Sequence, residues 1–144
     1  MTRAPVLDAR PHFTAAKARI GAVHTQLGID TYRFGEVPGT LGPNGQLNPG
    51  ERPAIYVLVQ VERTYYPSAK QTHSTRSTWR ISLRYVGATY SEAEWAGARI
   101  SEAFESTTLN VAGFLSKPLA HDVSDPVAAD DGMFSGFVAF TYAL

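Results

Sequence analysis

The sequence contains no cysteine among its 144 residues, and it also lacks a long hydrophobic run and a net charge. Without cysteine, the chain forms no disulfide bond, carries no thiolate nucleophile and holds no zinc through sulfur. No stretch approaches the roughly 18 apolar residues that a membrane-spanning helix needs. The N-terminus has no continuous apolar segment typical of a secretory signal. We therefore expect no membrane partner.

The charge balance argues against a protein dedicated to nucleic acid. Lysine and arginine number 13, aspartate and glutamate also number 13, and the formal net charge is zero. A dedicated nucleic-acid-binding domain is usually strongly basic. Apolar residues make up 44% and charged residues 18% of the chain, which is typical of a globular protein. The length predicts one domain that covers residues 1–144.

Hydrophobic periodicity predicts the α+β class. One amphipathic helix is expected at 11–27, where apolar residues recur at spacings of three and four. Alternating or continuous apolar residues predict strands at 31–37, 54–63, 78–87 and 133–144. The expected fold is a mixed or antiparallel sheet of about four or more strands, flanked by two helices.

A second helix is expected directly after the strand at 78–87. The segment SEAE at 91–94 fits a capping box, in which Ser91 accepts from the backbone of Glu94 and Glu94 reaches back. Farther along, four apolar residues share one side of this helix and predict a buried stripe: Ala96, Ile100, Ala103 and Phe104.

Two segments are expected to be irregular. Residues 38–53 contain four prolines and four glycines, so we expect a long loop that builds no ladder of strand hydrogen bonds. The last third of the chain, from the end of the second helix up to Gly132, contains Pro118 and Pro126, and we expect no regular element there. The strand at 133–144 is apolar on both faces, which predicts a central place in the sheet or burial in a partner.

Charges are segregated along the chain. The strands 54–63 and 78–87, with the long polar connection between them, predict a projecting β-arm. No acidic residue occurs between Arg63 and Arg84, and no lysine or arginine occurs in 119–132. We predict that these stretches contact neighbouring subunits or DNA. The candidate contact residues are Arg63, Lys70, Arg76, Arg80, Arg84, Asp122, Asp125, Asp130 and Asp131.

The sequence offers little catalytic chemistry. His121 and Asp122 could form a base with its orienting carboxylate, but adjacent residues of a strand point to opposite faces. The segment ADDG at 129–132 fits a solvated turn better than a cation site, because calcium-loop spacing is missing. The glycines of 38–53 lack the Gly-Lys-Ser/Thr of a phosphate loop. We expect no enzyme activity, no cofactor and no metal.

The order of elements resembles a family of virion proteins. YRFGEVPG, RPAIYVLVQV and WRISLRYVGATYSEAEWAGARISEAF look like the tail terminator (minor tail) proteins of long, non-contractile-tailed bacteriophages. KPLAHDVSDPVAADD is similar to that family's connector before its last strand. The likeness extends from about residue 31 to the end of the chain.

The resemblance implies a structural role in a phage tail. It implies a homohexameric ring at the head-proximal end of the tail, which caps the tail-tube protein, stops tube growth and meets the head connector. DNA would pass through the lumen without sequence-specific binding. The ring would assemble in the host cytoplasm and remain in the virion. The family brings no catalytic residue to this sequence.

Other functions remain possible at this point. A head–tail connector (completion) protein or a tail-tube protein would be another structural component of the same particle. A small nucleic-acid-binding module could use Tyr65, Tyr66 and Trp79 between the basic residues, because bases stack on aromatic side chains. A small hydrolase would have to use His121 or the acidic turn.

Overall fold

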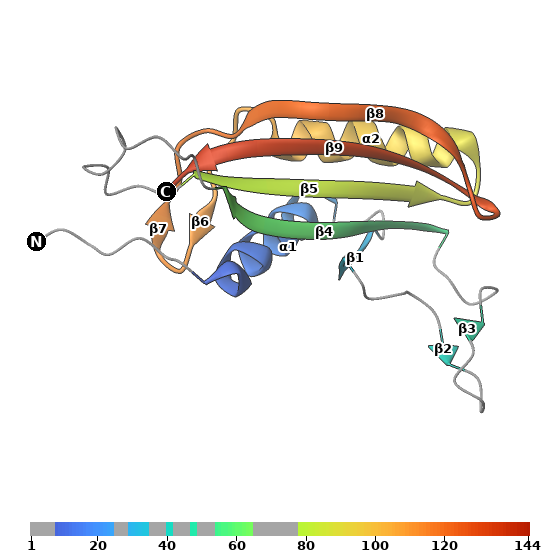
Figure 1. Ribbon diagram of the computed structural model, residues 1–144, viewed down its shortest axis with the longest axis horizontal. Helices are drawn as coiled ribbons and strands as arrows, with labels where there is room; N and C mark the ends of the chain where they lie inside the picture. The colour runs from blue at the N-terminus through green and yellow to red at the C-terminus, as the bar shows by residue number, and fades with distance from the viewer. Residues whose placement is uncertain (1–7, 25–28, 35–39, 42–46, 49–53, 65–77) are drawn as a thin grey trace, which may run out of the picture.

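The computed structural model describes residues 8–24, 29–34, 40–41, 47–48, 54–64 and 78–144 (Figure 1). Two helices and five strands make up the body of this part of the chain. They are α1 (Ala9–His24), β1 (Asp30–Arg33), β4 (Ile55–Thr64), β5 (Thr78–Gly87), α2 (Tyr90–Phe104), β8 (Ala120–Asp130) and β9 (Met133–Ala143). Within these described residues, neither helix has the length and apolarity to cross a bilayer.

The five strands form one mixed sheet in the order β1-β4-β5-β9-β8. Strand β1 pairs with β4 in parallel, and the other three pairs are antiparallel. Both helices lie behind the sheet in the view of Figure 1, so they cover the same face. The α+β class and the mixed sheet flanked by two helices, as expected from the sequence, are confirmed.

The core lies between the helices and this covered face. In β4, Val57 and Val59 are buried, and they stand opposite Tyr85 and Leu83 of β5. Residues directly opposite each other in an antiparallel pair share a face. The expected stripe of α2 is confirmed, since its four residues are fully buried. Residues Ala16 and Ile20 of α1 join the same cluster.

Strand β9 lies between β5 and β8. Val138, Phe140 and Tyr142 point into the core, and Ala139 on the other face is also buried. A strand with neighbours on both sides and little solvent on either face tolerates apolar residues throughout. The expected central position of the last strand is therefore confirmed.

The expectation of an irregular segment at 119–132 is wrong. Residues 120–130 form β8, an edge strand that pairs with β9 through two register shifts. The second shift lies between Asp125 and Ala128 and contains Pro126. Proline donates no ladder hydrogen bond, so it is tolerated in a strand at an edge or a bulge.

A tight turn joins β8 to β9. Asp130 pairs with Met133, which leaves Asp131 and Gly132 as a two-residue loop. Both residues have positive φ, 48° and 81°, as in the turns that match the twist of a hairpin. The acidic segment at 129–132 therefore comprises the end of β8 and the two residues of the hairpin turn.

Two smaller expectations also need correction. Within 38–53, β2 (Thr40–Leu41) and β3 (Leu47–Asn48) form a short antiparallel ladder. Another small ladder joins β6 (Asn110–Val111) and β7 (Phe114–Leu115). The ladder of β2 and β3 covers only two residues in each strand, so the prolines and glycines around it do not interrupt it.

Helix α2 begins earlier than the capping box predicts. Its N-cap is Thr89, whose hydroxyl accepts a hydrogen bond from the backbone N–H of Glu92 at 3.2 Å. Ser91 lies inside the first turn. Both Thr89 and Ser91 have side chains suited to an N-cap, and the short connection from β5 decides in favour of the earlier one.

The strands of the expected β-arm belong to the body of the sheet. Strands β4 and β5 pair along their whole length, from Ile55 opposite Gly87 to Thr64 opposite Thr78. Strand β5 is the middle strand of the sheet. The connection 65–77, which would form the projecting tip, lies outside the described residues.

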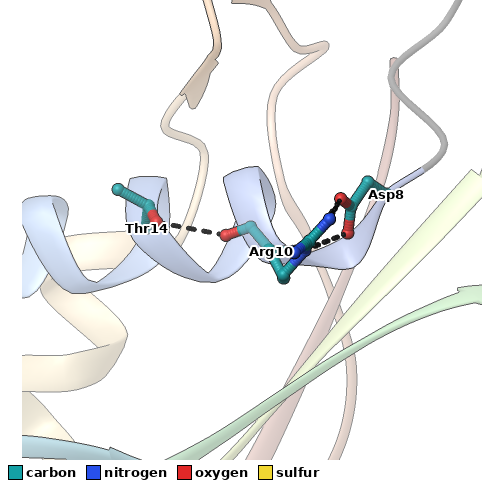
Figure 2. Close-up of polar contacts among 3 residues, drawn as sticks. All are labelled: Asp8, Arg10 and Thr14. Carbon is teal, nitrogen blue, oxygen red and sulfur yellow. Dashed lines mark hydrogen bonds and ion pairs between the residues drawn. The ribbon is translucent and has the colours of Figure 1, made fainter.

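Helix α1 begins with a carboxylate cap (Figure 2). The Oδ1 atom of Asp8 accepts from the backbone N–H of Arg10 at 3.0 Å, and the Arg10 guanidinium pairs with the same carboxylate at 2.6 Å. Thr14 donates its hydroxyl to the carbonyl of Arg10 at 3.1 Å. The side-chain and backbone hydrogen bonds from Arg10 lower the pKa of Asp8 to about 2.

Candidate interaction surface

The face of the sheet that points away from the helices is the candidate functional surface. No helix of the described residues covers it. We call it the open face. It carries Arg80 and Arg84 of β5, because these residues alternate with the buried Ile81 and Leu83. The alternation along the strand thus places both arginines on the same face.

Arg80 joins three strands of the open face. Its Nε atom lies 2.9 Å from an Asp122 carboxylate oxygen on β8, and its Nη1 atom lies 3.8 Å from Glu62 on β4. To reach Asp122, the side chain extends over β9, where Thr141 stands opposite Arg80. Both partners are partly exposed, with 40% of the Arg80 side chain and 32% of the Asp122 side chain accessible. The ion pair is therefore screened by solvent.

Arg84 belongs to a second polar chain on the same face. It donates through Nη1 to the hydroxyl of Ser135 at 3.3 Å, and Ser135 donates to Asp130 Oδ2 at 2.9 Å. The guanidinium carbon also lies 5.6 Å from the centre of the Phe137 ring. Ser135 is buried, so this chain holds Arg84 and Asp130 in fixed positions at the hairpin end of the sheet.

The other predicted basic residues are placed differently. Arg63 stands opposite Trp79, so it lies on the helix-covered side of the sheet. Lys70 and Arg76 lie outside the described residues. Trp79 is 1% exposed and stacks on His12 with ring centroids 3.8 Å apart. The idea that Trp79 stacks on a nucleic-acid base is therefore wrong, because the ring is already buried in the core.

The acidic residues divide in a similar way. Asp122 pairs with Arg80, and Asp130 is tied to Arg84 through Ser135. Asp125 and Asp131 are exposed and form no ion pair within the described part of the chain. Part of the charge complementarity expected between subunits is thus satisfied inside one subunit, and Asp125 and Asp131 are left for other contacts.

His121 and Asp122 do not form a catalytic pair. The ring of His121 stands edge-on to Phe140 on the covered side, whereas Asp122 reaches Arg80 across the open face. Opposite orientation of neighbouring strand residues separates them. In the ranges that the structure describes, no cluster of three potential metal ligands occurs.

A groove lies between α2 and the edge strand β8, with a volume of about 460 Å³. Its lining includes two carboxylates, an imidazole and two tyrosines, and it contains no lysine or arginine. The residues that carry these groups are Glu94, Asp125, His121, Tyr85 and Tyr90.

Two glycines make room for Tyr85 beside this groove. A Cβ atom at Gly97 of α2 would lie 2.6 Å from Tyr85 Cζ, and one at Gly136 of β9 would lie 2.5 Å from the same atom. The ring is thus held between helix and sheet. Burial raises the pKa of the Tyr85 hydroxyl, and the nearby charge of Asp125 adds to this effect.

Sequence reasoning missed Ser135 of the open face, and it missed Tyr85, Gly97 and Gly136 at the groove on the covered side. A tyrosine among buried strand residues and a glycine within an apolar helix stripe are weak signals on their own. These residues indicate a packed site only once the fold has brought β5, β9 and α2 together. A glycine inside a strand does indicate close approach of another group, which is what Gly136 provides.

Comparison with known proteins adds evidence on the fold. No protein-family model matches the chain, and no curated protein matches it. A solved structure of the virion of a native gene transfer agent particle contains a chain that matches with a TM-score of 0.61 over 91% of this chain and 92% of that one. A second solved structure matches with a TM-score of 0.56 at 12% identity, over 95% of both chains. At 13% identity in the first case, the likeness shows the fold alone.

Proposed function

We propose that this chain is a structural protein of a phage-like virion and forms the ring that terminates a tail tube. The observation that carries the proposal is the likeness in fold to a chain of a gene transfer agent virion, which spans 91% of this chain and 92% of that one. The tail-terminator pattern of the sequence supports the same role.

The shape of the sheet supports assembly into a ring. Its two edges differ, since β1 has four residues and β8 has eleven. A contact between unlike surfaces of identical subunits is head-to-tail, and it closes into a ring when the rotation between subunits permits. We propose a homohexamer, in agreement with the resemblance seen in the sequence.

In this proposal the ring has three neighbours. It binds the last ring of tail-tube protein on one side and the head connector on the other, and DNA passes through its lumen. DNA has to slide, so only a few salt-sensitive phosphate contacts are needed. The ring would assemble in the host cytoplasm and stay at the head-proximal end of the tail. The role requires no enzyme activity and no cofactor.

Electron microscopy paired with native mass spectrometry tests the proposal. The purified chain at high concentration, or mixed with tail tubes, should give closed six-membered rings or tubes capped at one end. Because weak interfaces make assembly depend on concentration, a series of concentrations is needed. Failure to form rings or to bind tubes at any concentration would contradict the proposal.

A second structural role has the same support from the fold and is separated by the same experiment. A tail-tube protein would polymerise into long tubes, whereas a terminator stops at one ring. A head–tail connector would form a ring that binds heads but leaves tube growth unaffected. Measuring tube length with and without the chain distinguishes the three.

A further inference from the structure

The edge strand β8 buries little of its own surface. Val127 is its only half-buried residue, and every other residue of the strand is exposed. In β5, at the middle of the same sheet, most residues are buried. Elements with few buried apolar contacts open at a lower free energy than the core of a protein does. Packing therefore contributes little to holding β8 on the sheet.

The pairing of β8 with β9 is interrupted in the middle of the strand. Between Asp125 and Ala128, the two residues Pro126 and Val127 stand opposite the single residue Gly136. Such a bulge disrupts the ladder locally, and proline has no N–H to donate to it. Gly136 also has no side chain that could form a cross-strand pair. The middle of β8 thus lacks ladder hydrogen bonds and side-chain pairs at the same place.

The two faces of β8 give its middle little further support. On the covered side, the groove of about 460 Å³ separates the strand from α2, with Tyr85 and Val138 in its lining. Atoms that line an open space have no packing partner on that side. On the open face, the strand is linked to β5 by the ion pair of Arg80 and Asp122. This pair is partly exposed, so its contribution is small.

Both ends of β8 are held more firmly. Leu119, which precedes the strand, is buried, and its backbone forms hydrogen bonds with Ser106 at 3.0 Å and with Thr107 at 2.8 Å. At the other end, the two-residue turn leads directly into β9, and Ser135 donates to Asp130 at 2.9 Å. The strand is therefore fixed at its ends and weakly held between them.

We infer that β8 is a strap whose middle opens away from β9 while the rest of the fold stays intact. The two register shifts supply the slack, because β8 is two residues longer than the stretch Met133–Thr141 with which it pairs. Opening uncovers the edge of β9, and an unpaired edge is the kind of surface to which a further strand adds. The inference concerns the single chain and does not depend on the proposed ring.

Strand β9 provides an internal control for a hydrogen-exchange test. Phe34 donates to the carbonyl of Val59, so the backbone of Val59 faces β1. In antiparallel pairs, the backbone groups of successive residues point alternately to one neighbour and to the other. The registers of β4, β5 and β9 then direct the N–H of Val138 toward β5. The N–H groups of Phe137 and Ala139 point toward β8.

Native-state hydrogen exchange, followed by NMR at a series of low urea concentrations, tests the strap. The protection factors of the Phe137 and Ala139 amides should be about a hundredfold or more below that of Val138, because local opening needs less free energy than global unfolding. They should also depend less on urea, since local opening exposes little surface. Equal protection factors with equal urea dependence would overturn the inference, because β8 would then open only when the whole chain unfolds.

A disulfide across the strap tests whether its opening is the route of exchange. The chain has no native cysteine, and Val123 stands directly opposite Ala139. Cα atoms of opposite residues lie about 4.5–5.5 Å apart, which suits a disulfide. In the variant Val123→Cys/Ala139→Cys, oxidation should slow exchange of the Phe137 amide by about tenfold or more. The reduced form of the same variant is the control, and an unchanged rate on oxidation would contradict the inference.

Two ion-pair variants separate opening of the strap from unfolding of the whole chain. Asp122→Asn removes the link to Arg80 and should lower the protection factor of Phe137 about two- to fivefold, as expected for a partly exposed pair. Glu102→Gln removes the pair with Arg99 on α2, which stays intact when only the strap opens. It should leave the protection factor of Phe137 unchanged. An equal loss in both variants would overturn the inference.

Discussion

The two faces of the sheet are built from the same strands but differ in composition and in role. On the covered face, β5 contributes Trp79, Ile81 and Leu83, which are 1% exposed or less. On the open face, the alternate residues Arg80 and Arg84 hold carboxylates and hydroxyls in place. The covered face therefore provides folding free energy, whereas the open face presents polar groups to solvent and is the surface that we propose for partners. Mutations should separate the two.

The largest loss of stability should come from the covered face. Phe104 of α2 is fully buried and stacks on Phe140, with ring centroids 6.1 Å apart. Phe104→Ala should lower the free energy of unfolding by about 3–5 kcal/mol, because it removes the buried ring and leaves a cavity. Urea denaturation measures this. The matched variant Phe137→Ala removes the same ring from the partly exposed open face, and an equal loss there would contradict the contrast.

A smaller loss should follow from adding one methyl group beside Tyr85. In Gly136→Ala the new Cβ atom would lie 2.5 Å from Tyr85 Cζ, and such overpacking costs about 1–3 kcal/mol. Thermal denaturation would show the change. Gly21→Ala is the control, since no atom lies within 4 Å of its added Cβ. That variant should be neutral or stabilising by up to about 1 kcal/mol, because alanine favours a helix over glycine.

Combining Gly136→Ala with Tyr85→Leu sharpens this test. If the clash with the tyrosine ring is the cause, the second change should relieve part of the loss caused by the first. Additive losses in the double variant would place the strain elsewhere.

The ion pair of the open face should contribute less still. A double-mutant cycle with Arg80→Ala and Asp122→Ala should give a coupling of about 0.2–1 kcal/mol, as for partly exposed pairs. The coupling should fall in 1 M salt, where charges are screened within about 3 Å. The pair Arg99–Glu102 on α2, at 2.8 Å, serves for comparison. A coupling that salt leaves unchanged would mean that the contact is not mainly electrostatic.

The covered face could be predicted from sequence because its signals are local and strong. The alternating valines of 54–63 and the apolar stripe of 96–104 are both buried only if the helix packs against the valine face of the sheet. The position of Arg63 was also available, since it has the same parity as Val57 and Val59 and must share their face. Treating all basic residues between 63 and 84 as one patch overlooked this alternation.

The edge strand could not be predicted as easily. Residues 120–130 are exposed except for Val127, so they show no alternation of apolar and polar residues. Two register shifts also break the pairing with β9. The pair Asp131-Gly132 was a usable hairpin signal, but Pro126 outweighed it. The pairing with β9 shows that β8 is an edge strand, and an edge strand accommodates this proline.

The groove and the ion pairs depend on contacts between distant segments. Arg80 and Asp122 are 42 positions apart, and their pairing requires β9 to lie between β5 and β8 with a small residue at Thr141. Tyr85, Gly97 and Gly136 come from three different elements. A sequence pattern can indicate that such residues exist, but their meeting follows from the strand order.

The smallest effect should arise at the start of α1, on neither face of the sheet. The pKa of Asp8 falls from 3.8 to about 2, chiefly through its side-chain hydrogen bond with Arg10. Because the folded-state pKa is lower than the unfolded value, the contribution of the cap is present above pH 4. It is lost as the pH falls through about 2. NMR titration of the Asp8 carboxyl should give a midpoint near 2. The variant Asp8→Asn keeps an oxygen acceptor but carries no charge, so the fraying of α1 in this variant should not depend on pH in this range. A midpoint close to 3.8 would mean that Arg10 does not hold the carboxylate in solution.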